Sequence, residues 1–114
     1  MAFTTTNATT IVAAVKLRER ILSEFRDIKP LIQLDTPKSL QEVLKKLRFI
    51  VKMIEIFMND EKANLYKSDK IALEDLLQAG VVNFISVFES KSEIERLKIA
   101  VSLEKMAKDI LQTD

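Results

Sequence analysis

The 114-residue chain contains no cysteine, histidine or tryptophan, and it has only one glycine and two prolines. Without cysteine there are no disulfides, thiolate nucleophiles or zinc–thiolate sites. Without histidine the chain lacks the side chain that most often acts as a general base or metal ligand near neutral pH. One glycine cannot build a phosphate-binding loop, and so few glycines and prolines cannot supply the tight turns of an all-β fold. We therefore expect an all-α protein that is not an enzyme and has no metal, cofactor or small-molecule substrate.

The residues that are present are largely apolar or charged, at 47% and 31% of the chain. A chain of this length and composition is typical of one globular domain. It shows neither a signal-peptide core nor a long uncharged apolar segment, so we expect no contact with a membrane. The expected location is the cytoplasm, or the host cytoplasm or nucleus if the protein is viral.

Apolar residues at helical spacing predict four main helices, at about residues 10–29, 38–58, 69–79 and 93–111. We expect these helices to form a compact single-domain bundle over residues 10–114. The Thr-rich residues 1–9 are expected to be a flexible tail. Pro30 is expected to end the first helix, and Gly80 to end the third by adopting a positive φ.

Capping residues mark two of the helix starts. Thr36-Pro37 and the capping-box pattern Ser39-x-x-Glu42 both precede the second helix, and Ser92-x-x-Glu95 precedes the last one. Two short helices are predicted in addition, at about 61–66 and 81–89. The second of these segments is so rich in β-branched and aromatic residues that an extended conformation also fits. We favour a helix, because the sequence offers no second strand to pair with it.

A line of basic residues runs along the predicted second helix. Spacings of seven, three and four place four of them on one side, with Lys46 next to them: Lys38, Lys45, Arg48 and Lys52. Such a stripe could contact a polyanion or an acidic partner protein. Phe49 and Phe57 are expected to point toward the core, so no aromatic side chain would lie among the cations to stack on bases.

A second candidate site lies at the end of the same helix. Met53, Phe57 and Met58 have the spacing of core residues, but they could also line a groove for a partner helix.

The charges divide unevenly along the chain. Residues 1–54 hold ten basic and five acidic residues, whereas residues 55–114 hold eight basic and twelve acidic ones. A contact between a positive and a negative half would be heterologous and would form rings or filaments. We therefore expect a protein–protein interaction or assembly module that forms homo-oligomers. Two alternatives stay open: a nucleic-acid-binding accessory or regulatory protein that uses the basic stripe, and a small viral or phage protein that inhibits a host factor.

Overall fold

The computed structural model describes residues 2–60 and 65–111, with side chains from residue 16 onward. Three long helices are α1 (Ala2–Leu34), α2 (Pro37–Asn59) and α5 (Glu93–Leu111). Between α2 and α5 lies a composite helix, residues 67–90, which consists of α3 (Lys67–Asp75), the π-helical segment η2 (Leu76–Val82), α4 (Asn83–Val87) and the 3-10 turn η3 (Phe88–Ser90). No strand occurs among the described residues, and the predicted all-α bundle is confirmed.

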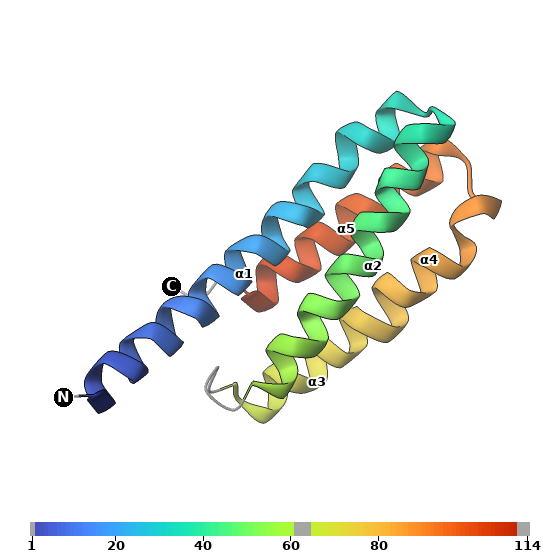
Figure 1. Ribbon diagram of the computed structural model, residues 1–114. Helices are drawn as coiled ribbons and strands as arrows, with labels where there is room; N and C mark the ends of the chain where they lie inside the picture. Colours follow the sequence, from blue (N-terminus) through green and yellow to red (C-terminus); the bar gives the residue numbers. More distant parts are fainter. Residues whose placement is uncertain (1, 61–64, 112–114) are drawn as a thin grey trace.

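The four long elements pack side by side, and each runs antiparallel to the next one in the chain (Figure 1). Helix α1 contacts α2 on one side and α5 on the other, and the composite helix closes the bundle between α2 and α5. The composite helix therefore lies diagonally across from α1. This arrangement leaves an outer face on every helix.

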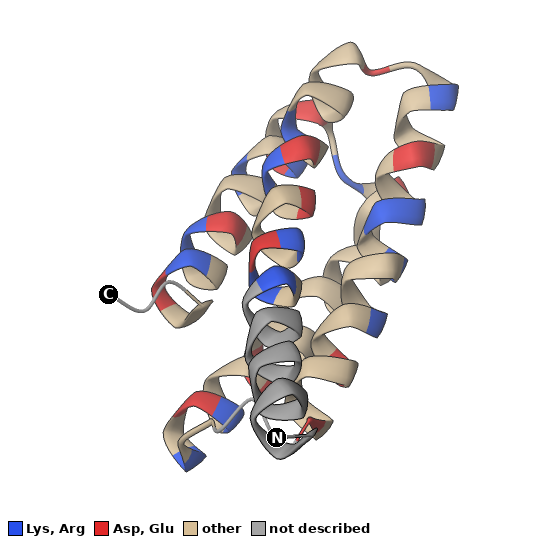
Figure 2. Ribbon diagram, turned by 60° about the vertical axis from the view of Figure 1, so that its left-hand side comes forward, with Lys and Arg blue, Asp and Glu red and all other residues tan. Residues whose placement is uncertain are grey.

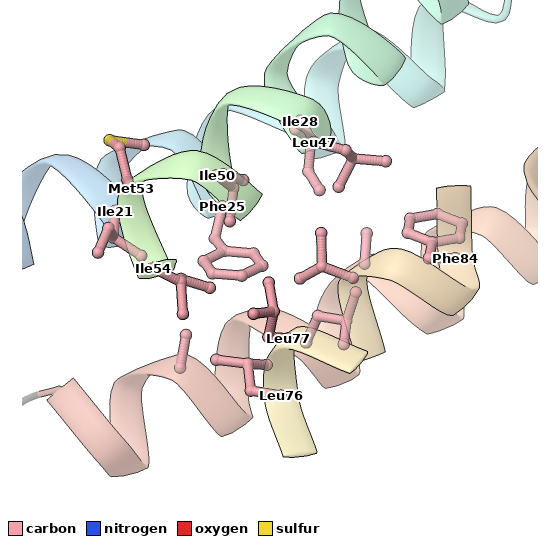
Figure 3. Close-up of a cluster of buried hydrophobic side chains, with 14 of the residues drawn as sticks. Ile21, Phe25, Ile28, Leu47, Ile50, Met53, Ile54, Leu76, Leu77 and Phe84 are labelled. Atoms are coloured by element: carbon pink, nitrogen blue, oxygen red, sulfur yellow. The ribbon is translucent and has the colours of Figure 1, made fainter. Parts of the chain in front are cut away.

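One hydrophobic core fills the space between the four helices. Its largest fully buried side chains include four phenylalanines, contributed by α1, α2, α4 and η3: Phe25, Phe57, Phe84 and Phe88. Figure 3 shows Phe25 projecting from α1 toward Leu77 of η2, with Ile54 of α2 beside it. Burying a side chain of this size stabilises the fold by roughly 1.5–3 kcal/mol, so the apolar faces are sufficient to hold the helices together.

Thr36 caps the start of α2. The Ser39-x-x-Glu42 pattern, which was also expected to mark this start, does not. The Ser39 amide donates to Thr36 Oγ1 at 3.0 Å, and the Thr36 amide donates to Ser39 Oγ at 3.0 Å. The expected Ser39–Glu42 capping box is therefore wrong, because Ser39 is the third residue of a helix that begins at Pro37. The box at the start of α5 is confirmed, with the Ser92 amide donating to Glu95 Oε1 at 3.1 Å and the Glu95 amide to Ser92 Oγ at 3.2 Å.

We expected helix α1 to end at Pro30, and this expectation is wrong. Pro30 is exposed and lies inside the helix, which continues for one more turn to Leu34. Ile32 in that turn is completely buried, and its packing offsets the hydrogen bond that proline cannot donate. The helix ends at Asp35, which has a φ of 50° and whose amide donates to the Ile32 carbonyl at 3.1 Å.

Gly80 does not end a helix either, because it lies within η2 and has no positive φ. The predicted helices 69–79 and 81–89 are thus parts of one composite helix, and the helical reading of residues 81–89 is confirmed over the extended one. A Cβ atom on Gly80 would lie 2.7 Å from Cδ2 of Leu103 in α5. Glycine thus lets the side chain of Leu103 pack closely against the composite helix, and a larger residue here would require Leu103 to shift.

The remaining predicted boundaries fall near the ends of the described segments. Residues 61–64 of the predicted short helix 61–66 lie outside the described residues, and Leu65 and Tyr66 precede α3 without being helical. The backbone of α1 is helical from Ala2 onward, whereas the predicted helix began at about residue 10. The flexibility of residues 1–9 stays a prediction.

The composite helix is long and apolar enough to cross a membrane if only its length and composition are considered. Core helices of soluble proteins also meet this criterion, and Leu73, Leu76, Leu77, Val81 and Phe84 of this helix are packed in the core. The structure is thus compatible with a soluble protein.

Two buried carboxylates hold α1 to its neighbours. Glu24 of α1 is paired with Lys46 of α2, and Glu104 of α5 is paired with Lys29 of α1, whose Nζ lies 2.8 Å from Oε1. Both glutamate side chains are only 7% exposed. The bond with Lys29 is the main cause that lowers the pKa of Glu104, and Lys108 contributes as well.

The lowered pKa of Glu104 makes the stability of the fold dependent on pH. Its contribution is present above the ordinary pKa of 4.5 and is lost as the pH falls through the lower folded-state value. We expect Lys29→Met to reduce the free energy of unfolding more at about pH 7 than at about pH 2.5. Urea denaturation at the two pH values measures this, with the exposed Lys105→Met as control. An equal loss at both pH values would contradict the role given to this pair.

The contact of Gly80 with Leu103 predicts the effect of added volume. Gly80→Val should reduce the free energy of unfolding by about 1–3 kcal/mol through overpacking. The control Ala79→Val, at the exposed neighbouring position, should cost less than about 1 kcal/mol. Thermal or urea denaturation compares the two variants. Combining Gly80→Val with Leu103→Ala should cost less than the sum of the single changes, and equal losses for Gly80→Val and Ala79→Val would refute the packing argument.

Candidate functional site

A surface groove of about 470 Å³ runs between α1 and α2. We call it the α1–α2 groove; its lining residues are Arg20, Glu24, Glu42, Lys45, Lys46, Arg48, Phe49 and Lys52. Five of these eight residues are basic and two are acidic. Four of the five residues of the predicted basic stripe therefore line one hollow, and only Lys38 is not among its lining residues.

The carboxylate of Glu24 lies at the inner side of the groove and has two cationic partners. Arg20 Nε lies 3.1 Å from Oε1, and Lys46 Nζ lies 3.0 Å from Oε2. A buried carboxylate is stable only when its charge is compensated in this way. The ion pair with Glu24 therefore joins Lys46 of α2 to α1. Lys46 is thus less available to an external partner than we expected from the sequence.

Arg20 also brings an aromatic ring into the site. Its guanidinium carbon lies 5.6 Å from the centroid of the Phe49 ring, which is within the range of a cation–π interaction. Phe49 is 44% exposed. The expectation that Phe49 points into the core is therefore wrong, whereas it is right for Phe57, which is completely buried beneath Arg18.

The other cations of the stripe are exposed on the outer side of α2. Figure 2 shows basic positions repeated along the length of this helix, on the side toward the viewer's right. Within the part of the chain that the structure describes, no ion pair involves Lys38, Lys45, Arg48 or Lys52. These four cations are thus exposed to solvent.

The apolar side of the site was missed from the sequence. Ile56, which is 61% exposed, lies in a shallow hollow next to the groove, and the two hollows share Lys52. A signal for it exists: Lys38, Glu42, Lys45, Phe49, Lys52 and Ile56 alternate in steps of four and three, which places them along one line of a helix. The site is thus a mainly basic row in which Phe49 lies between cations and Ile56 lies at the end.

The second predicted site, at Met53, Phe57 and Met58, is not an open groove on the surface. Met53 and Phe57 belong to the buried core, and Met58 is half-buried against it. A partner helix could reach them only if the bundle opened. The apolar surface that α2 does offer consists of Phe49 and Ile56.

No three acidic, cysteine or histidine side chains among the described residues come together to hold a metal ion. Two carboxyl groups have a lowered pKa, and both lie outside the groove. Hydrogen bonds from Ser92 at the start of α5 lower the pKa of Glu95, and the ion pair with Lys29 lowers that of Glu104. Each shift thus has its cause in a helix cap or in helix packing.

Comparisons with known proteins give no family for this chain. No protein-family model matches it, and no curated protein or solved structure matches it either.

Neighbouring lysines in the groove should differ in their importance for stability. Lys46→Met removes one of the two cations that compensate buried Glu24, so we expect a loss of about 1–2 kcal/mol in the free energy of unfolding. Lys45→Met, the matched control at an exposed position without an ion pair, should change it by less than about 0.5 kcal/mol. Urea denaturation of the two variants makes the comparison. The assignment of Lys46 to the interior would be wrong if both variants lost the same stability.

Proposed function

We propose that this protein is a non-enzymatic protein–protein interaction module that self-associates through the α1–α2 groove. The observation that carries the proposal is that Lys45, Arg48 and Lys52 are exposed without ion pairs around the exposed ring of Phe49. Stable protein interfaces combine an apolar centre with a polar rim. Phe49 and Ile56 supply the first, and the cations around them supply the second.

The self-association part of the proposal is supported by the charges of the chain. The cations of the groove belong to the basic half, and the half that begins at Glu55 carries the excess of acidic residues. Every copy of the chain therefore carries both the basic groove and acidic residues that could face the groove of another copy. Complementary charges accelerate association and orient the partners.

A nucleic-acid ligand is the second candidate, and one observation favours it. Phe49 lies among the cations, and an exposed aromatic ring within a basic groove is the arrangement that stacks on single-stranded bases. Glu42 in the groove and Glu55 next to it weaken this candidate, because acidic side chains repel phosphates. We therefore place the protein partner first.

Sedimentation velocity tests the proposed function. Between about 1 and 100 μM the mean mass should rise above that of the 13.0 kDa monomer, and it should fall again when salt is raised from about 50 to 300 mM. Arg48→Glu combined with Lys52→Glu should abolish the rise. The control Lys98→Glu with Lys105→Glu makes the same charge change on exposed positions of α5 and should preserve it.

A constant mass of 13.0 kDa under all conditions would contradict self-association. The same samples are then titrated with a labelled single-stranded DNA of about 15 nucleotides at both salt concentrations. Binding by a monomer that is lost in Arg48→Glu/Lys52→Glu would establish the second candidate in its place.

A further inference from the structure

The outer face of the composite helix carries apolar and acidic side chains that no other described residue covers. Ile71 is 57% exposed and Val82 37% exposed, and Glu74 and Asp75 are exposed between them. Among the described residues, neither Glu74 nor Asp75 takes part in an ion pair. These four residues are called the outer face below.

The helix that carries this surface is rich in apolar residues. The most apolar stretch of the composite helix has the hydropathy of a membrane-spanning segment, yet only 39% of it is buried inside the bundle. Apolar surface exposed to water costs free energy in proportion to its area. A partner that covers the outer face would recover part of that free energy.

The composite helix and α2 both run from basic to acidic residues in chain order, so their charges are complementary when the two helices lie antiparallel. On the composite helix two lysines are followed by an apolar residue and then by two acids: Lys67, Lys70, Ile71, Glu74 and Asp75. On α2 three cations surround an apolar residue and are followed by an acid and a second apolar residue: Lys45, Arg48, Phe49, Lys52, Glu55 and Ile56. If the two helices run antiparallel, the acids face the cations, Ile71 lies between Phe49 and Ile56, and the two lysines lie near Glu55.

We propose that the outer face of one copy binds in the α1–α2 groove of a second copy, with the composite helix antiparallel to α2. This proposal rests on the proposed function and adds to it the surface that fills the groove. The opposite charges give the contact its orientation and its salt dependence. Ile71 and Phe49 give it the apolar centre that rim charges alone do not supply.

The position of the two surfaces determines how the copies assemble. The composite helix lies across the bundle from α1, so its outer face and the α1–α2 groove point in different directions. The contact is therefore heterologous: in a pair of copies, one copy retains a free groove and the other a free outer face. Such contacts generate rings or filaments and do not stop at a symmetric dimer.

An exposed apolar surface on α5 offers no comparable match. Ile94 and Val101 are exposed there and share a shallow hollow with Leu97 and Lys98. The charged residue in this hollow is basic, as are most of those that line the groove. Charge complementarity therefore selects the composite helix as the surface that fills the groove.

A charge-swap series followed by sedimentation velocity tests this contact. The groove variant Arg48→Glu/Lys52→Glu and the face variant Glu74→Lys/Asp75→Lys should each weaken self-association by more than about tenfold. The chain that carries all four changes should associate again, because its basic outer face now fits an acidic groove. The control combines the groove variant with Glu19→Lys and Asp109→Lys, which are exposed and lie outside both surfaces, and it should stay monomeric at the same net charge.

A second measurement needs no charge reversal and uses the absence of cysteine from the chain. Lys45→Cys in one copy and Gln78→Cys in another should form a mixed disulfide dimer under mild oxidation, because the antiparallel contact places these positions opposite each other. Each variant oxidised alone should give far less dimer. Ile94→Cys paired with Gln78→Cys is the control, and little cross-linked product is expected from it.

The outcomes separate the two proposals. If the wild-type chain associates but the four-fold variant stays monomeric and the disulfide does not form, the outer face is not what fills the groove, and the proposed function survives. If the wild-type chain never associates, both proposals fail. Circular dichroism of every variant at 222 nm verifies that the helices are intact, and the disulfide experiment remains decisive if a charge-swapped chain does not fold.

Discussion

The carboxylate of Glu24 is the interaction on which the α1–α2 surface depends. A charge buried to this degree must be compensated, and the chain provides two cations for it, one from its own helix and one from α2. Lys46 is thereby drawn inward, and Arg20 is held where its guanidinium also meets the ring of Phe49. The cations without such a task, among them Lys45 and Arg48, remain on the outside. One buried charge thus sorts the basic residues of α2 into a structural one and a group available for binding.

The requirements of the interior and of the surface are separate in this bundle. Inside, four phenylalanines fill the core, Glu104 joins α5 to α1 through Lys29, and Gly80 lets α5 approach the composite helix. Each of these needs is met within the chain. Outside, the cations of α2 and the acids Glu74 and Asp75 have no ion-pair partners among the described residues. The charges without ion-pair partners therefore lie on two surfaces of opposite sign, and the assembly that we propose would satisfy both at once.

Features that depend on neighbouring residues were predictable from the sequence, and features that depend on distant contacts were not. The caps at Thr36 and Ser92 are local, and they placed the starts of α2 and α5 correctly. Pro30 and Gly80 were expected to end helices because each residue type commonly does so. Burial of the last turn of α1 outweighs this preference at Pro30, and packing against Leu103 outweighs it at Gly80. The basic stripe was found from its spacing, whereas the exposure of Phe49 was not. Hydrophobicity alone assigned that ring to the core, and only the position of α1 beside α2 shows that it lies at the surface.

The most direct test of the account is a dilution series followed by NMR of the backbone amides. Dilution from about 500 to 10 μM at low salt dissociates a weak self-contact, and the amides that shift identify its surfaces. The account predicts shifts on two separate surfaces, residues 45–56 of α2 and residues 67–82 of the composite helix, with the outer side of α5 around Ile94 and Val101 unchanged. Shifts confined to α5, or to one of the two surfaces alone, would contradict it.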